Sequence, residues 1–182
     1  MEYISNSRFK GKKVALIHEW YSSKFNGGAE KALEIINRVL EENFSVPKLF
    51  GLVANISPKE NNWLFQKEIS TSFINKLPFS KNHFHKYLPL FPFAIEQFDL
   101  DQYNLVISSS HSVAKGVITS PDQLHISYIH SPMRYAWDQM NIYLNQSSYK
   151  KLRLTLFLRF ILQSLRKWDY ISSVRVDKFI AN

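Results

Sequence analysis

The chain has 182 residues, of which 45% are hydrophobic and 21% charged, as expected of a globular domain with one sizeable core. It contains no cysteine, which excludes disulfide bonds and thiolate metal sites. The opening segment MEYISNSRFKGKK lacks the apolar core of a signal peptide and no apolar run is long enough to span a bilayer, so we expect a cytoplasmic location. The net charge of +8 and the pI near 9.6 indicate a polyanionic neighbour, such as nucleic acid, a phosphorylated ligand or an anionic membrane surface.

Residues 14–41 predict a strand, a glycine-containing turn and a helix, the first half of a βαβ unit. The run VALI at residues 14–17 is uninterrupted and apolar, as in a strand buried on both faces of a sheet. Gly27 and Gly28 then precede a segment whose apolar residues recur at helical spacing. Glycines let a ligand approach the backbone and a helix start offers free N–H groups, so the pair indicates a phosphate site, although it also fits a plain tight turn. The polar residues 1–12 before this unit predict a flexible N-terminal tail.

The rest of the chain alternates between strand and helix patterns. Strands are predicted within residues 48–54, 67–72, 103–110, 124–129 and 177–182, with Gly51 shortening the first of these. Short apolar strands that alternate with helices are typical of a parallel sheet flanked by helices. We therefore predict that residues 13–182 form one α/β, Rossmann-like domain with a mainly parallel sheet.

Polar side chains follow three of the predicted strands at their carboxyl ends, where parallel α/β sheets bind their ligands. They are His18, Glu19 and Trp20 after the first strand, His111 and Lys115 after the strand at 103–110, and His130, Arg134, Trp137 and Asp138 after the strand at 124–129. So many functional residue types at one edge favour a binding or catalytic site, although each of the first three residues fits a structural role equally well. The serines at 108–110 lack a G-x-S-x-G elbow, so we do not predict a hydrolase.

Two further segments are basic and amphipathic. Residues 73–98 are interrupted by prolines, and their aromatic residues alternate with basic ones that include Lys76, Lys81 and Lys86. This pattern predicts either a helical subdomain that buries its aromatic residues against the sheet or a surface that faces lipid. Residues 149–170 predict a long basic helix, either packed on the sheet with a solvated face or lying on anionic lipid. We favour residues 73–98 as the lipid-facing element, because the long helix is expected to pack its apolar side on the sheet.

Several segments resemble family 4 of the glycosyltransferases, above all bacterial members that build cell-surface polysaccharides. The resemblance is carried by HEW after the first strand, by NGGAEK, by the long run from residue 77 to residue 138, and by RVDKFIAN. It implies a GT-B enzyme, in which the active site lies between two Rossmann-like domains. This chain would be the N-terminal, acceptor-side domain, and the C-terminal, donor-binding domain is absent from it. The family more often has HDW where this chain has HEW, which leaves the role of Glu19 open.

The resemblance also implies roles for individual residues. His130 matches the histidine that points at the donor sugar in related enzymes and supports the transition state, and Gly27 and Gly28 match the loop near the donor diphosphate and the acceptor. It further implies a reaction that retains anomeric configuration, needs no metal, and uses the leaving phosphate to help deprotonate the acceptor hydroxyl. The sequence is consistent with this, since it shows neither paired acid/base carboxylates nor clustered metal ligands. The acceptor-binding candidates are Glu19, His111, Lys115, Arg134 and Trp137, and the membrane-contact candidates are Lys76, Lys81 and Lys86.

The expected function is that of a retaining glycosyltransferase that moves a sugar from a nucleotide-sugar to a lipid-linked saccharide acceptor. The expected partners are these two substrates and the anionic inner face of the plasma membrane, without nucleic acid, metal or other cofactor. The chain alone would be inactive, because the donor-gripping half is missing. Two alternatives remain open: a non-catalytic basic α/β module that binds membrane or nucleic acid, and a free-standing, flavodoxin-like nucleotide-binding domain.

Overall fold

The computed structural model describes residues 11–23, 27–57, 63–146 and 152–181, and the predicted tail lies mostly outside this part of the chain. Its strands form one sheet in the order β3-β2-β1-β4-β5-β6, and all neighbouring strands are parallel. The strands are β1 (Val14–Ser22), β2 (Lys48–Asn55), β3 (Ile69–Thr71), β4 (Leu105–Ser110), β5 (Leu124–Ile129) and β6 (Lys178–Ala181). The predicted α/β, Rossmann-like fold with a parallel sheet is confirmed.

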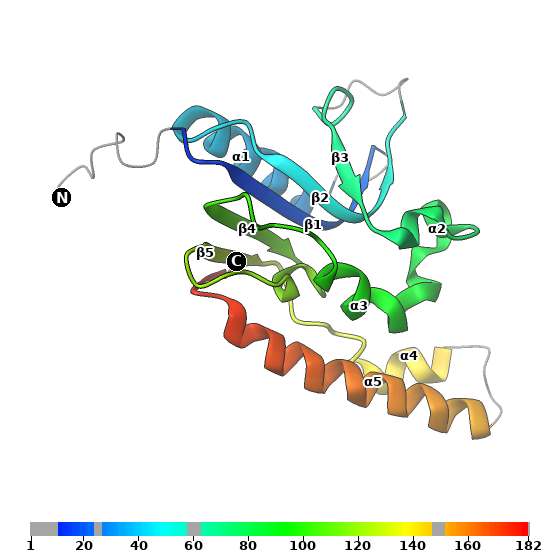
Figure 1. The fold of residues 1–182 in the computed structure, drawn as a ribbon. Helices are drawn as coiled ribbons and strands as arrows, with labels where there is room; N and C mark the ends of the chain where they lie inside the picture. The colour runs from blue at the N-terminus through cyan, green and yellow to red at the C-terminus, as the bar shows by residue number, and fades with distance from the viewer. Residues whose placement is uncertain (1–10, 24–26, 58–62, 147–151, 182) are drawn as a thin grey trace.

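Helices cover both faces of this sheet (Figure 1). α1 (Gly28–Asn43) lies on one face, while α3 (Phe91–Glu96) and α5 (Leu152–Ser172) lie on the other. The shorter elements are η2 (Phe73–Lys76), α2 (Ser80–His83), η3 (Phe84–Leu90), η4 (Ala114–Gly116), α4 (Met140–Gln146) and η5 (Ser173–Arg175). The glycine pair lies at the start of α1, as predicted, with Gly27 as the N-cap residue and Gly28 as the first helical residue.

The hydrophobic core has one part on each face, because successive side chains of a strand point to opposite faces. Leu16 of β1 packs in the cluster that contains Leu33 of α1. Its neighbour Ile17 packs in the other cluster, with Ile95 of α3 and Leu162 of α5. The apolar run at the start of β1 is thus buried on both faces, and it holds the three layers together.

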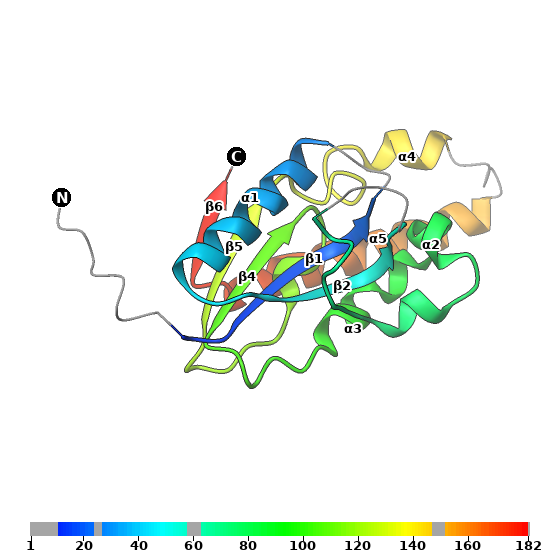
Figure 2. The ribbon, with the colours of Figure 1, turned by 90° about the horizontal axis from the view of Figure 1, so that it is seen from above.

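The strand order creates a reversal of chain direction between β1 and β4. The chain proceeds from β1 to β2 and β3 on one side and then returns to place β4, β5 and β6 on the other side. In open α/β sheets such a reversal opens a crevice beyond the carboxyl ends of the two central strands, and ligands bind there. Figure 2 shows that the strands point toward the end of the molecule at which α1 begins.

Two strands differ from the sequence prediction. β1 continues through His18, Glu19 and Trp20 to Ser22, so these residues lie inside the strand instead of in a loop after it. β2 likewise is not shortened at Gly51, because it continues to Asn55. A Cβ at Gly51 would lie 2.8 Å from Cδ2 of Tyr21 in the neighbouring strand, so the strand needs a glycine to let this buried ring pass.

Residues 73–98 fold as short helical turns, η2 to α3, which matches the helical-subdomain alternative. Phe91 is fully buried, and Phe84 packs against the same core. Two aromatic side chains of the segment, Phe79 and Phe93, remain exposed. Most of the aromatic residues therefore contribute to the fold.

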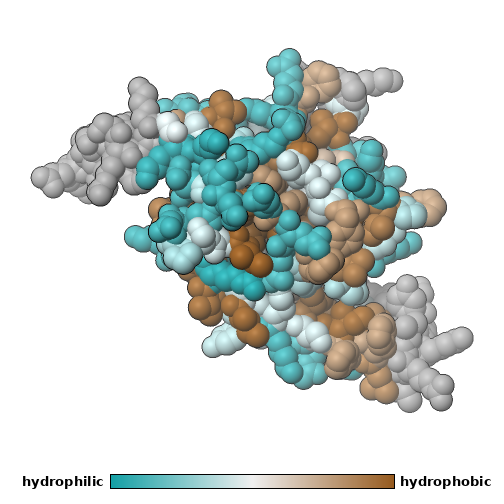
Figure 3. All heavy atoms as spheres, in the orientation of Figure 1, coloured by the Kyte–Doolittle hydropathy of each residue, from teal (hydrophilic) through white to brown (hydrophobic). Residues whose placement is uncertain are grey.

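The apolar side of the long helix α5 packs on the sheet along only part of its length, whereas we predicted that the whole side would pack there. Leu162 is buried in the core, whereas Leu156, Phe157 and Phe160, in the preceding turns, are 58%, 59% and 66% exposed. Brown hydrophobic residues gather in Figure 3 over the region where α3 and α5 lie in Figure 1. No helix in the described residues is both long enough and apolar enough to cross a membrane.

Substituting Gly51→Ala should destabilise the protein by about 1–3 kcal/mol, because the new methyl group would overlap the Tyr21 ring. Gly28→Ala is the matched control, since a Cβ there would meet nothing within 4 Å, and it should leave the stability unchanged or slightly higher. Urea unfolding of both variants measures the difference. Equal stability of Gly51→Ala and the unsubstituted protein would contradict the close packing of β1 on β2.

Candidate functional site

Three histidines from three adjacent strands meet at the carboxyl edge of the sheet. His18 lies in β1, His111 directly follows β4, and His130 directly follows β5. The rings of His111 and His130 are stacked, with centroids 4.3 Å apart, and the His18 centroid lies 5.4 Å from that of His111 and 6.3 Å from that of His130. One ring nitrogen of each lies within 4.8 Å of the others. We call these residues the histidine cluster. The sequence pattern, in which no metal ligands are clustered, did not indicate it.

Hydrogen bonds define the state of the buried member of the histidine cluster. Nδ1 of His18 lies 2.7 Å from the carbonyl oxygen of Ser109, and because a carbonyl only accepts, Nδ1 must carry the proton. Nε2 of His18 then presents a lone pair, and neither it nor Nε2 of His111 has a hydrogen-bond partner within the described part of the chain. Ser109 also contacts the third histidine, since its Oγ lies 2.8 Å from Nε2 of His130.

Burial keeps two histidines of the cluster neutral at pH 7. Burial lowers the pKa of His18, and the attraction of the neighbouring Glu19 carboxylate does not restore it. Burial also lowers the pKa of His130, and the adjacent His111 and His18 lower it further, to about 4. A neutral imidazole can accept a hydrogen bond, take up a proton or bind a metal ion.

Glu19 holds the loop that carries His111. Its side chain is fully buried, and its Oε1 accepts hydrogen bonds from the backbone N–H groups of His111 (3.0 Å), Ser112 (2.8 Å) and Ala114 (2.9 Å) and from the Ser110 hydroxyl (3.1 Å). Burial acts to raise the pKa of Glu19, but the two neighbouring histidines and these N–H donors together lower it, so the carboxylate is ionised. Glu19 was an acceptor-binding candidate, and this environment instead favours a positioning role.

A second group of polar side chains lies around Asp169, which was not among the predicted site residues. Lys115 Nζ lies 2.6 Å from Asp169 Oδ1, and Trp137 Nε1 donates to Asp169 Oδ2 at 2.9 Å. Lys115 and Asp169 line a cavity of about 170 Å³ together with Ser110, Ser112 and Ser131. This volume corresponds to roughly five or six water molecules. Two acceptor-binding candidates, Lys115 and Trp137, thus lie together at Asp169. The sequence signal that could have identified Asp169 is that it is the first acidic residue of a basic helix.

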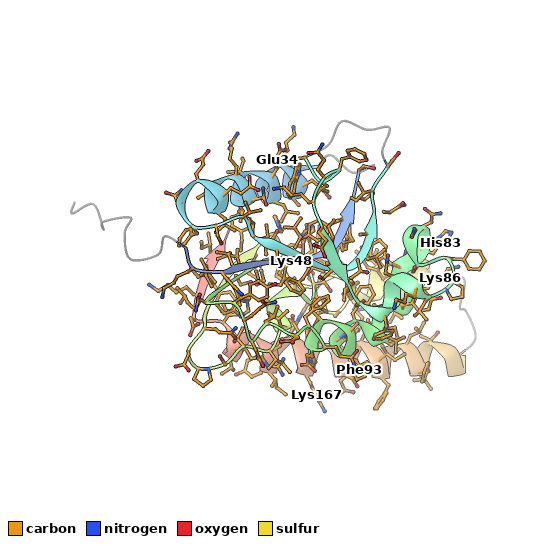
Figure 4. All side chains as sticks on the ribbon, turned by 45° about the horizontal axis from the view of Figure 1, so that its top comes forward. Glu34, Lys48, His83, Lys86, Phe93 and Lys167 are labelled. Atoms are coloured by element: carbon orange, nitrogen blue, oxygen red, sulfur yellow. The ribbon has the colours of Figure 1, made fainter. Side chains whose placement is uncertain are left out.

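The remaining candidates lie at the surface. Arg134 is exposed and forms a long ion pair of 3.8 Å with Asp138. Lys76, Lys81 and Lys86 are exposed on the segment that contains α2 and η3. Figure 4 shows Lys86 pointing outward from that segment.

The glycine pair lies on the same side as the histidine cluster. The backbone N–H of Gly27 donates to Oε2 of Glu30 at 3.0 Å, so a carboxylate already occupies one donor of this helix start. The Glu30 charge also acts weakly on the pKa of His18 and His130, after burial and nearer groups, which places the start of α1 near the cluster. Gly28 faces open space. A phosphate site here stays a prediction, and a phosphate would have to share the helix start with Glu30.

The free energy of unfolding should decrease as the pH falls from 7 to 5. Burial lowers the pKa of His125 and of His130 to about 4, and lowers that of His18, so below about pH 6.5 the unfolded chain binds more protons than the folded chain. The fully buried His125 alone should account for about 1 kcal/mol between pH 7 and pH 5.5. Urea unfolding at several pH values measures this, and His125→Asn should flatten the slope. A stability that stays constant or rises toward pH 5 would contradict the neutral, buried histidines.

Comparisons with protein-family models, with curated proteins and with solved structures found no match for this chain. Its function is therefore argued from the sequence motifs and from the geometry of the two polar groups.

Proposed function

We propose that this chain is the N-terminal, acceptor-side domain of a retaining, GT-B-type glycosyltransferase. It would transfer a sugar from a nucleotide-sugar to a saccharide acceptor carried on a lipid, in the synthesis of a cell-surface polysaccharide. The proposal starts from the resemblance of the HEW, NGGAEK and HSPMRYAWD segments to that family. The observation that supports it best is the position of His130, partly exposed at the end of β5, one strand away from the reversal between β1 and β4.

The charge state of His130 suits the proposed reaction. Glycosyl transfer develops positive charge on the sugar ring as the leaving group departs. Burial first, and then His111 and His18, lower the pKa of His130 to about 4, so its imidazole is neutral at pH 7. A neutral ring can hydrogen-bond a sugar hydroxyl without repelling that developing charge. His130 would contact the donor sugar, while the diphosphate would be held by the second domain with no metal ion.

The cavity beside Asp169 supports the acceptor side of the proposal. Its lining offers the Lys115–Asp169 ion pair and the hydroxyls of Ser110, Ser112 and Ser131, which suit the many hydroxyls of a saccharide. Ile129 and Ser131, the residues on either side of His130 in the sequence, line this cavity, whereas His130 itself does not. Trp137 lies at the same ion pair and is 44% exposed, which leaves part of its ring free to stack on a sugar.

The face formed by α3 and α5 supports contact with the membrane on which a lipid-linked acceptor resides. Phe157 and Phe160 of α5 and Phe93 of α3 are exposed, and Arg159 and Lys167 lie on the same helix as the first two. In Figure 4, Phe93 and Lys167 both point away from the sheet. Because residues 73–98 bury most of their aromatic side chains, we assign the apolar part of the contact to α5 and leave the charged part to Lys76, Lys81 and Lys86. The same face would also suit the alternative function, that of a non-catalytic module that binds membrane. In such a module His130 would have no catalytic role.

His130→Ala in the two-domain enzyme should lower turnover by roughly 10²-fold or more, because the residue would contact the reacting sugar. Release of nucleoside diphosphate from a panel of nucleotide-sugars, with extracted membrane lipids as acceptor, measures turnover. The melting temperature should change little, since His130 is partly exposed at a strand end. His85→Ala, which replaces an exposed histidine outside the histidine cluster, is the control and should change neither value. An unchanged rate with a lower melting temperature would refute the catalytic role.

Co-sedimentation with liposomes should show binding to anionic lipid that weakens with salt and is weak on neutral lipid. Phe157→Ser with Phe160→Ser removes the apolar part of the contact, and glutamate at Lys76, Lys81 and Lys86 removes the charged part, which is worth up to about 1 kcal/mol per residue. Both sets should reduce binding. Ile35→Ser with Val39→Ser, two exposed apolar residues of α1 on the opposite face, is the matched control. Binding that ignores lipid charge, or that survives both sets, would contradict the proposal.

A further inference from the structure

We propose that His18, His111 and His130 form a binding site for a transition-metal ion, with Zn²⁺ as the ion that suits three imidazole ligands. The proposal goes beyond the proposed transferase, which uses no metal, and it rests on the geometry of the histidine cluster alone.

The arrangement of the rings comes close to that of a metal site. A zinc ion with three imidazole ligands at about 2.0–2.1 Å requires ring nitrogens roughly 3.3 Å apart. The three nitrogens of the cluster already lie within 4.8 Å of one another. The stacked rings of His111 and His130, inclined by only 17°, must open so that both lone pairs point at the ion. Both residues are partly exposed, whereas the buried His18 provides a fixed ligand.

The hydrogen bonding of His18 is that of a metal ligand. Metal-binding histidines typically donate the ring N–H that is not used for the metal to a backbone carbonyl or a carboxylate. Nδ1 of His18 donates to the Ser109 carbonyl in this way, which leaves the lone pair of Nε2 free. That nitrogen is completely buried, and among the described residues it has no hydrogen-bond partner, as is also true of Nε2 of His111. An unpaired buried acceptor costs free energy, and a bound ion would remove this cost.

The electrostatics also favour a cation. The ionised carboxylate of Glu19 lies 3.7 Å from Nδ1 of His18 and supplies negative charge next to the site. The three protein ligands leave the fourth position of a tetrahedral ion for water or a ligand atom.

Metal binding would have a consequence for the proposed transferase. An ion bound to His130 would use the same imidazole that contacts the donor sugar in the proposed reaction. Zn²⁺ should therefore inhibit turnover, and His130 would be shared between the two roles.

The test uses the 182-residue chain and metal ions alone, so it does not depend on any transferase activity. Zn²⁺ binding is measured by isothermal titration calorimetry at pH 7.5, and Co²⁺ replaces Zn²⁺ as a probe whose visible spectrum reports tetrahedral coordination. We expect one ion per chain and a tetrahedral Co²⁺ spectrum. His111→Ala and His130→Ala, tested separately so that the result does not depend on one variant, should each weaken Zn²⁺ binding at least tenfold. Circular dichroism and melting curves of both variants show whether they are folded.

His83→Ala with His85→Ala is the matched control, because it removes the other pair of neighbouring histidines, whose rings lie 5.9 Å apart, and leaves the cluster intact. This double variant should bind Zn²⁺ like the unsubstituted chain. The proposal is overturned if the chain binds no ion more tightly than millimolar, if folded His111→Ala and His130→Ala variants bind as well as the unsubstituted chain, or if binding disappears in the control.

Discussion

Glu19 carries an ionised carboxylate into the centre of the sheet, and the loop after β4 folds around it. Burying such a charge costs several kcal/mol unless hydrogen bonds satisfy its oxygens. Here three backbone N–H groups and a hydroxyl do so, which fixes the course of residues 110–114. That course sets His111 against His130 and directs Lys115 toward Asp169. Both polar groups of the candidate site therefore depend on the same buried charge, which is why we regard Glu19 as a residue that positions the site and does not itself contact substrate.

The three serines at the end of β4 show how a buried strand can end in polar residues. The Ser108 hydroxyl lies 2.9 Å from Nε2 of the buried His125, and Ser109 contacts His18 through its carbonyl and His130 through its hydroxyl. The Ser110 hydroxyl donates to Glu19. Each serine thus satisfies a polar group of a neighbouring strand or loop, which lets Glu19 and His125 be buried. This is a structural use for a run of hydroxyls, in agreement with the absence of a nucleophile elbow.

Patterns that depend on neighbours in the sequence predicted the fold well, and interactions across the sheet were missed. The strand at residues 124–129 was predicted with the bounds that β5 has, and the helix start at Gly28 was located from the glycine pair. β1 was predicted too short because His18 and Glu19 are polar, and what allows their burial is a set of partners about 90 residues away in the chain. The histidine cluster and the ion pair of Asp169 were missed for the same reason. Periodicity indicates which face a residue takes, and only the strand order shows which residues share an edge.

Helix α5 carries both the proposed lipid contact and a residue of the proposed acceptor cavity. Its exposed apolar turns at Phe157 and Phe160 would touch lipid, and its last turns bring Asp169 to the cavity beside Lys115. Phe157 and Asp169 are separated by about 18 Å along a helix that rises 1.5 Å per residue. In the proposed enzyme, a saccharide attached to a membrane lipid would therefore need to extend only over this distance to reach the cavity. An acceptor whose first sugar is attached directly at the lipid phosphate would be too short to reach the cavity. It could reach only if the C-terminal end of α5 entered the membrane–water interface. The depth to which α5 enters the membrane would therefore determine the minimum length of the acceptor.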